Sequence, residues 1–184
     1  MLITIDRNIL IAALKIEPTS SLVATIFTAH RDGNIAIAIS AANRVEYRVG
    51  DEHPQTEEQF LHDCSTGGLD NPTLLDYPLD WEMGLWESSI IDAEGFDLDT
   101  RIHAVLFPNL PNFLSTDQND KERRRIRNVR CDVFAIWGHI RFDRDYFITS
   151  DQRFLKRKDA LVKLGARGIC TPEEFVKNVL IPAP

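Results

Sequence analysis

Two aspartates in the sequence directly follow short apolar runs that are typical of buried strands. Asp6 comes after residues 2–5, Leu-Ile-Thr-Ile, and Asp151 comes after residues 146–150, Tyr-Phe-Ile-Thr-Ser. In a parallel α/β sheet, ligands bind just beyond the carboxyl ends of the strands. Carboxylates gathered there would be partly desolvated and would repel one another unless a cation joined them. Hard divalent ions such as Mg²⁺ and Mn²⁺ prefer such oxygen ligands.

Two further acids lie on segments that we expect to be helical. A helix over residues 41–49 would carry Glu46 near its middle, one turn in from the strand expected at residues 35–39, so that Glu46 could face the strand tips. Asp132 lies in an otherwise apolar helix expected from residue 131 to about residue 141. A carboxylate on such a helix is costly unless it is paired or bound to a metal.

Each acid also has a purely structural interpretation. Aspartate is a good helix N-cap, and that role alone would explain either Asp6 or Asp151. Asp132 could form a salt bridge with Arg127 or Arg130. The two strand-end aspartates taken together, with further acids on the helices between them, favour a cation site over these separate roles.

The pattern of apolar residues predicts the elements that position these acids. In chain order we expect a strand at 2–6, helices at 8–15 and 20–30, a strand at 35–40, a helix at 41–49, helices ending near 130 and 141, a strand at 146–150, a helix ending at 164, a strand at 167–170 and a last helix that begins at Thr171-Pro-Glu-Glu. This rhythm predicts an α/β fold with a mostly parallel sheet.

Residues 50–117 break that rhythm with turn-rich, irregular chain. Within this segment, residues 56–62, 80–89 and 100–107 could be short helices or strands. We therefore expect a single domain over residues 1–184 with an irregular acidic insertion at about 50–117.

Charge is distributed unevenly along the chain. The net charge is −7, yet residues 51–120 carry sixteen acidic side chains and one basic side chain. The basic run at residues 121–130 is either a solvated helix face or a phosphate-binding footprint. The candidates for contacts with an RNA backbone are Arg123, Arg124, Arg125, Arg127, Lys156 and Lys158.

Other properties narrow the class of protein. No stretch approaches the roughly 18 apolar residues of a membrane-spanning helix, and we expect no signal peptide because the first residues lack a basic region and a cleavage site. The three cysteines are far apart, and none forms a C-x-x-C pair. That usage argues against a disulfide framework or a zinc site and predicts a reducing, cytoplasmic environment.

Several segments together resemble the PIN-domain nucleases. They are Asp6-Arg-Asn8, residues 40–46, residues 132–139, residues 147–154 and the tail at 164–175. The resemblance covers about residues 1–50 and 118–180 and leaves the insertion unmatched.

The resemblance implies a three-layer α/β/α domain that hydrolyses RNA phosphodiester bonds with a divalent metal. By position, Asp6, Glu46, Asp132 and Asp151 would hold one or two Mg²⁺ or Mn²⁺ ions, and Asn8, Thr149 and Ser150 would support them. Many bacterial members are toxins of the VapC type, so an antitoxin protein is an expected partner besides RNA. Family behaviour also implies a homodimer.

Two other functions fit parts of the pattern. A PIN-like module could bind RNA or a protein without cleaving, although such a module has no need for four mutually repelling carboxylates. An α/β phosphatase could use Asp6 as a nucleophile, but Asn8 stands where the haloacid-dehalogenase pattern has a second aspartate. We expect His139 to be a core histidine bonded to backbone rather than a catalytic one.

Overall fold

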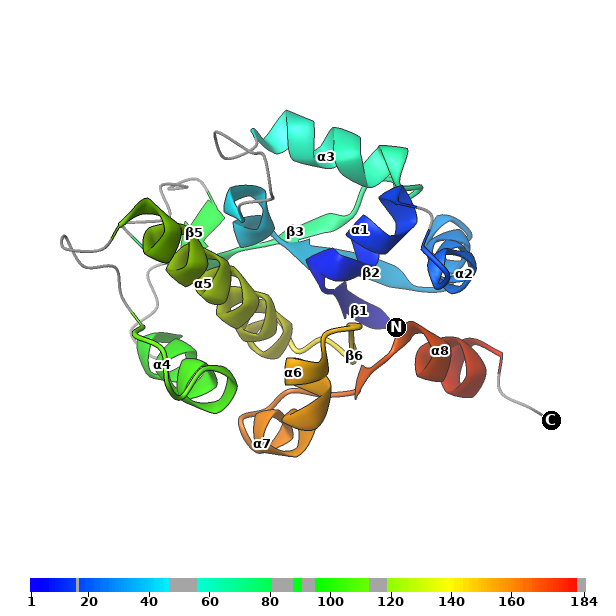
Figure 1. Cartoon of the computed structure of the whole chain (residues 1–184). Helices are drawn as coiled ribbons and strands as arrows, with labels where there is room; N and C mark the ends of the chain where they lie inside the picture. The colour runs from blue at the N-terminus through cyan, green and yellow to red at the C-terminus, as the bar shows by residue number, and fades with distance from the viewer. Residues whose placement is uncertain (16, 47–55, 81–87, 91–94, 113–118, 182–184) are drawn as a thin grey trace.

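Short apolar segments pair side by side in a parallel sheet (Figure 1). The computed structural model describes residues 1–15, 17–46, 56–80, 88–90, 95–112 and 119–181. The strands of the main sheet are β1 (Leu2–Ile5), β2 (Ala36–Ser40), β3 (Thr73–Leu75), β6 (Tyr146–Ile148) and β7 (Ile169–Cys170). Their order is β3-β2-β1-β6-β7, and every neighbouring pair is parallel. The α/β class and the mostly parallel sheet are thus confirmed.

Helices follow most of the strands. They are α1 (Arg7–Leu14), α2 (Ser20–Arg31), the short 3₁₀ helix η1 (Ala41–Val45), α3 (Glu57–Thr66), α4 (Gly95–Leu106), α5 (Asp120–Arg141), α6 (Gln152–Lys156), α7 (Lys158–Lys163), α8 (Pro172–Phe175) and the final helical turn η3 (Val176–Leu180). The signature predicted for the last helix is confirmed, because Thr171 and Glu174 form a capping box and proline occupies the first turn of α8.

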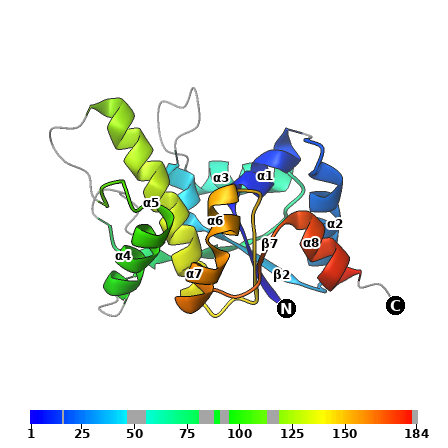
Figure 2. The same ribbon diagram turned by 60° about the horizontal axis from the view of Figure 1, so that its bottom comes forward.

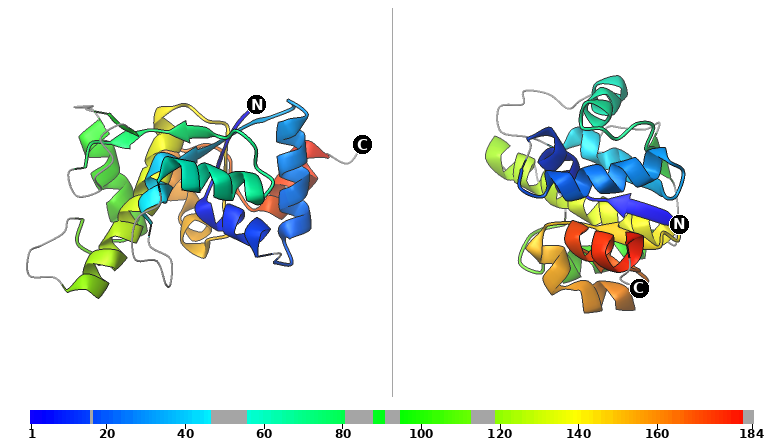
Figure 3. Two further views of the ribbon diagram at one scale, coloured as in Figure 1. Left: turned by 90° about the horizontal axis from the view of Figure 1, so that it is seen from above. Right: turned by 90° about the vertical axis from the view of Figure 1, so that its right-hand side faces the viewer.

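The central strands are covered on both faces. Ile3, Ile5 and Ile148 belong to a core shared with α1, α2, α3 and α8, whereas Phe147 belongs to a core shared with α4, α5, α6 and α7. The right-hand view of Figure 3 shows α1, α2 and α3 on one side of β1 and α7 on the other. This arrangement is compatible with three layers, and the burial of both faces explains why the strands are apolar nearly throughout.

Helix α5 is continuous, which corrects the expectation of two helices meeting near residue 130. Asn119 and Glu122 form a capping box at its start, and α5 then runs unbroken to Arg141. Gly138 lies within this helix and faces Leu75. A Cβ atom at this position would come within 3.3 Å of the Leu75 side chain, which explains why the residue is glycine. The glycine thus allows α5 to pass close to the end of β3.

The segment at residues 50–117 contains more regular structure than predicted. Helix α3 confirms the expected element at 56–62, α4 confirms a helix at 100–107, and β3 extends the main sheet. A separate parallel pair joins β4 (Tyr77–Pro78) to β5 (Ser89–Ile90). Most of the element expected at 80–89 lies outside the described residues.

Arg130 fastens part of this segment to α5. Its guanidinium is largely buried and forms ion pairs with Asp80 at 2.6 Å and with Asp99 at 3.4 Å. It also donates hydrogen bonds of 2.9 and 2.8 Å to the backbone and side-chain oxygens of Asn112. These contacts hold the chain around α4 against α5, two residues before Asp132. Within the described chain, no helix is both long and apolar enough to span a membrane.

Candidate metal centre

Asp6 and Thr149 meet where two neighbouring parallel strands end. Ile5 of β1 pairs with Ile148 of β6, so the residues that follow these strands are adjacent. The Thr149 hydroxyl donates a 2.7 Å hydrogen bond to Oδ2 of Asp6. Asp6 precedes α1 but its side chain makes no capping hydrogen bond to that helix, so an N-cap role does not account for it.

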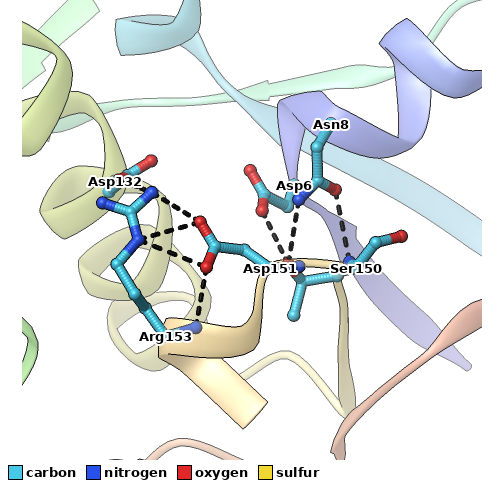
Figure 4. Close-up of polar contacts among 7 residues, drawn as sticks. Asp6, Asn8, Asp132, Ser150, Asp151 and Arg153 are labelled. Carbon is cyan, nitrogen blue, oxygen red and sulfur yellow. Dashed lines mark hydrogen bonds and ion pairs between the residues drawn. The ribbon is translucent and has the colours of Figure 1, made fainter. Parts of the chain in front are cut away.

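Thr149 also ties the neighbouring backbone to this carboxylate. Its hydroxyl oxygen accepts a 3.3 Å bond from the Asn8 amide and a 3.0 Å bond from the N–H of Asp151. Oδ1 of Asn8 lies 3.4 Å from the N–H of Ser150, which donates to it. The Ser150 side chain itself points away from the acids (Figure 4). Asn8 and Thr149 are thus brought together, whereas Ser150 contributes backbone only.

Asp151 combines a structural role with a place beside the other acids. Its side chain accepts a 2.7 Å bond from the N–H of Arg153 and so caps α6, which confirms the N-cap interpretation for this residue. The Arg153 side chain folds back onto the same carboxylate, with Nε 3.0 Å from Oδ2. Burial would raise the pKa of Asp151, but these bonds from Arg153 hold it below its usual value.

Asp132 faces the strand-end acids from α5 (Figure 4). Its Oδ2 lies 3.2 Å from the Arg153 guanidinium, and its side chain is 16% exposed. A salt bridge for Asp132 is therefore present, but the partner is Arg153, whereas Arg130 is engaged by Asp80 and Asp99. One guanidinium thus lies between the carboxylates of Asp132 and Asp151.

Glu46 reaches the cluster from a different local structure than predicted. The helix expected over residues 41–49 is confirmed only for residues 41–45, as the 3₁₀ helix η1, and its placement of Glu46 inside the helix is wrong, because Glu46 follows η1 in extended conformation. Residues 47–49 lie outside the described residues. The buried Arg7 guanidinium donates to the Glu46 backbone oxygen at 2.7 Å and pairs with its carboxylate at 3.2 Å. This contact turns Glu46 toward the start of α1.

Burial and neighbouring acids raise the pKa of two of the four carboxyl groups, those of Asp6 and Asp132. The pKa of Asp6 is raised to about 7, chiefly by burial and further by the charges of Glu46 and Asp151, while the Thr149 hydrogen bond acts to lower it. Burial also raises the pKa of Asp132 well above its usual value, and Asp6, Glu46 and Asp151 add to that effect. The Arg153 charge opposes the rise at Asp132, and the repulsion that remains is expected where carboxylates from four separate segments lie in one region.

The chemistry of the donor set fits a hard divalent cation. The carboxylates of Asp6, Asp132, Asp151 and Glu46, with the amide oxygen of Asn8 nearby, are all oxygen donors. Within the described part of the chain, no three acidic, histidine or cysteine side chains are already arranged to hold a metal ion. Three of the four carboxylates form ion pairs with arginines: Glu46 with Arg7, and Asp132 and Asp151 with Arg153.

The four α5 arginines that were candidates for RNA contacts line two hollows. One, of about 280 Å³, is lined by Asp120, Arg123, Arg124 and Arg127. The other, of about 350 Å³, adjoins the acids and is lined by Glu46, Phe107, Leu110, Arg125, Asn128, Val129, Asp132 and Arg153. The remaining two RNA-contact candidates, Lys156 and Lys158, are exposed and line neither hollow.

His139 is a core residue, as expected. It is 1% exposed, and its ring nitrogens lie 3.3 Å from the Thr4 hydroxyl and 2.9 Å from the backbone oxygen of Arg167. Burial lowers the pKa of His139 to about 4. The three cysteines are free thiols.

Arg7 and Arg153 are the site residues that the sequence analysis missed. Arg7 follows Asp6 directly and Arg153 comes two residues after Asp151. This closeness in the sequence to predicted metal ligands could have identified both arginines. Comparison with known proteins adds no family: no family model, curated protein or solved structure matches the chain.

Proposed function

We propose that this chain is a PIN-domain nuclease, a ribonuclease that hydrolyses RNA phosphodiester bonds with Mg²⁺ or Mn²⁺. One observation carries the proposal: Asp6, Glu46, Asp132 and Asp151 come from four separate segments and lie close enough that their charges raise the pKa of Asp6 and Asp132. Folding such a cluster costs free energy, and cation binding offsets that cost. The order of the acids along the chain and the parallel sheet agree with the resemblance to that family.

In this proposal, Asp6, Asp132, Asp151 and Glu46 hold the metal. A divalent cation bound there supplies an acidified water and polarises the phosphodiester. Thr149 orients the Asp6 carboxylate through its 2.7 Å bond, and Asn8 holds the Thr149 hydroxyl in turn. Outer hydrogen bonds of this kind set the position and basicity of metal ligands.

Arg153 fits this function as a neutralising group. Its guanidinium lies against Asp132 and Asp151, the position in which a positive charge lowers their repulsion. It also lies 5.1 Å above the Phe107 ring centroid, so the guanidinium can stay packed on this ring, next to the acids, when it leaves the aspartates. Release from the two aspartates would leave a guanidinium at the site, suited to bind a phosphate.

The direct test is cleavage of end-labelled structured RNAs with Mn²⁺ or Mg²⁺ by purified protein. We expect defined fragments that disappear with a chelator and fall at least a hundredfold with Asp6→Asn or Asp132→Asn. Asp143→Asn is the matched control, because Asp143 is exposed and pairs only with Arg167 among the contacts described. RNA binding without metal-dependent cleavage would instead identify a non-cleaving module.

A further inference from the structure

We infer that the hollow of about 350 Å³ beside the acids binds one purine nucleotide of the RNA, next to the bond that is cleaved. This inference rests on the proposed function. It assigns base selection to Phe107, Leu110, Arg125 and Asn128, which take no part in holding the metal. Two of them, Phe107 and Leu110, come from the insertion that has no counterpart in the family resemblance.

The position of the hollow links it to the acids. Glu46 and Asp132 form part of its wall, and Arg153 lies between that wall and Asp151. A phosphate held beside the acids would therefore place its neighbouring nucleotide in or across this hollow. A volume of about 350 Å³ lies in the range of small-molecule sites.

The lining has an apolar part and a polar part, as a nucleotide requires. Phe107, Leu110 and Val129 supply apolar lining. Phe107 and Val129 are largely buried and Arg153 lies over the Phe107 ring, so the flat face of a base would pack mainly against Leu110. Arg125 and Asn128, about two turns and one turn before Asp132 on α5, supply a guanidinium and an amide. Because they lie on the same helix as a metal ligand, their distance from the reacting phosphate is fixed.

The two polar groups favour a purine. An arginine pairs with O6 and N7 of guanine, and an asparagine pairs with N6 and N7 of adenine, so both complement the same edge of a purine. An unpaired base is required, because base edges within an RNA duplex are poorly accessible to side chains.

Contacts outside the hollow hold its apolar wall in place. Arg130 bonds to Asn112, two residues after Leu110, and to Asp99 of α4. Figure 2 shows α4 lying along α5 on this side of the molecule. The wall formed by Phe107 and Leu110 is thus fixed to the helix that carries Asp132, so the position of the hollow relative to the acids is fixed as well.

Two measurements test the inference, and the first is independent of cleavage. In the first, AMP, GMP, CMP and UMP are titrated into metal-free protein, and binding is followed by chemical shifts of backbone amides. We expect shifts at residues 107, 109, 110 and 125–132, with AMP or GMP at least tenfold tighter than the pyrimidine nucleotides. Shifts confined to other residues, or equal affinity for all four nucleotides, would overturn the inference.

In the second, a random-sequence RNA is cleaved with Mn²⁺, and base frequencies around the cut are read by sequencing. We expect a purine preference at one position, reduced about tenfold by Asn128→Ala and by Leu110→Ala. Asn178→Ala, an exposed control, should keep the preference. If both variants keep it, the pocket assignment is wrong although the nuclease stands. If nothing is cleaved but purines still bind in the hollow, the nuclease fails and the pocket stands.

Discussion

The hydroxyl of Thr149 donates to the buried carboxylate of Asp6 at 2.7 Å, across the ends of two adjacent parallel strands. The same hydroxyl oxygen accepts from Asn8 and from the backbone of Asp151. A single side chain therefore links two acids that are far apart in the sequence.

Asp6→Asn should stabilise the metal-free protein at pH 8. Since the folded pKa of Asp6 is about 7 and its ordinary value is 3.8, its contribution to stability is fully present below pH 3.8 and is lost as the pH rises through 7. A neutral asparagine avoids that loss, so we expect a gain of about 1–3 kcal/mol in chelator. Urea unfolding at pH 8 measures it, and lower stability of the variant would contradict the burial argument.

Thr149→Val should impair metal binding and cleavage although it preserves side-chain volume. It removes the donor to Asp6 and the acceptor for Asn8 and the Asp151 backbone. We expect about tenfold to a hundredfold weaker Mn²⁺ binding, the range found for outer-shell partners. Thr149→Ser keeps the hydroxyl and should restore most of the affinity. Equal losses in the two variants would point to packing rather than hydrogen bonding.

Arg153→Ala should strengthen metal binding and weaken RNA binding. The guanidinium competes with a cation for Asp132 and Asp151, so its removal should tighten Mn²⁺ binding by about threefold to tenfold in a calorimetric titration. Arg31→Ala is the matched control, because it removes the same charge away from the acids. Arg31 ends α2 and leads into the amino end of β2, whereas the acids lie beyond the carboxyl ends of the strands. Unchanged or weaker Mn²⁺ binding in Arg153→Ala would show that the arginine does not compete.

His139 should make the fold less stable in mild acid. Its folded pKa of about 4 lies below the ordinary 6.5, so the unfolded chain binds the extra proton first and stability falls as the pH drops below 6.5. Asp6 acts in the opposite direction over pH 3.8–7, so the informative quantity is the difference between wild type and His139→Gln. We expect that difference to shrink by about 2 kcal/mol between pH 7.5 and pH 5. Exposed His62, changed to Gln, should show no such trend.

The arginines of the smaller hollow should contribute to RNA affinity through charge. Changing Arg123, Arg124 and Arg127 together to Gln in the Asp6→Asn background should lower the slope of log affinity against log salt by about 2 for single-stranded RNA. Neutralising Lys15, Arg31 and Lys177 removes the same charge elsewhere. Equal effects of the two triple variants would show that the hollow has no special role.

The sheet could be predicted from the sequence because local pattern and burial agree there. Residues 3–5 and 147–148 are largely apolar, and the structure buries them on both faces of the sheet. The start of α8 was predictable because the side chains of Thr171 and Glu174 each accept a hydrogen bond from the other's backbone N–H, within a span of four residues. Signals of this kind depend only on neighbours in the chain.

Features that depend on distant residues could not be predicted. The helix expected through Glu46 ends at Val45, and Glu46 is held by Arg7, which lies 39 residues away. The two helices expected around residue 130 are one, with Arg130 anchored by Asp80 and Asp99 across the fold. The sequence places Arg153 beside Asp151 but does not reveal that it also reaches Asp132. Each of these contacts is selected by tertiary packing.

The central claim is that Asp6, Glu46, Asp132 and Asp151 act as one cation site. The most direct measurement is a calorimetric titration of wild type, Asp6→Asn and Asp132→Asn with Mn²⁺, each first shown to be folded. We predict saturable binding of one or two ions in the wild type and its loss in both variants. Binding that persists in both variants, or no saturable binding in the wild type, would contradict the account.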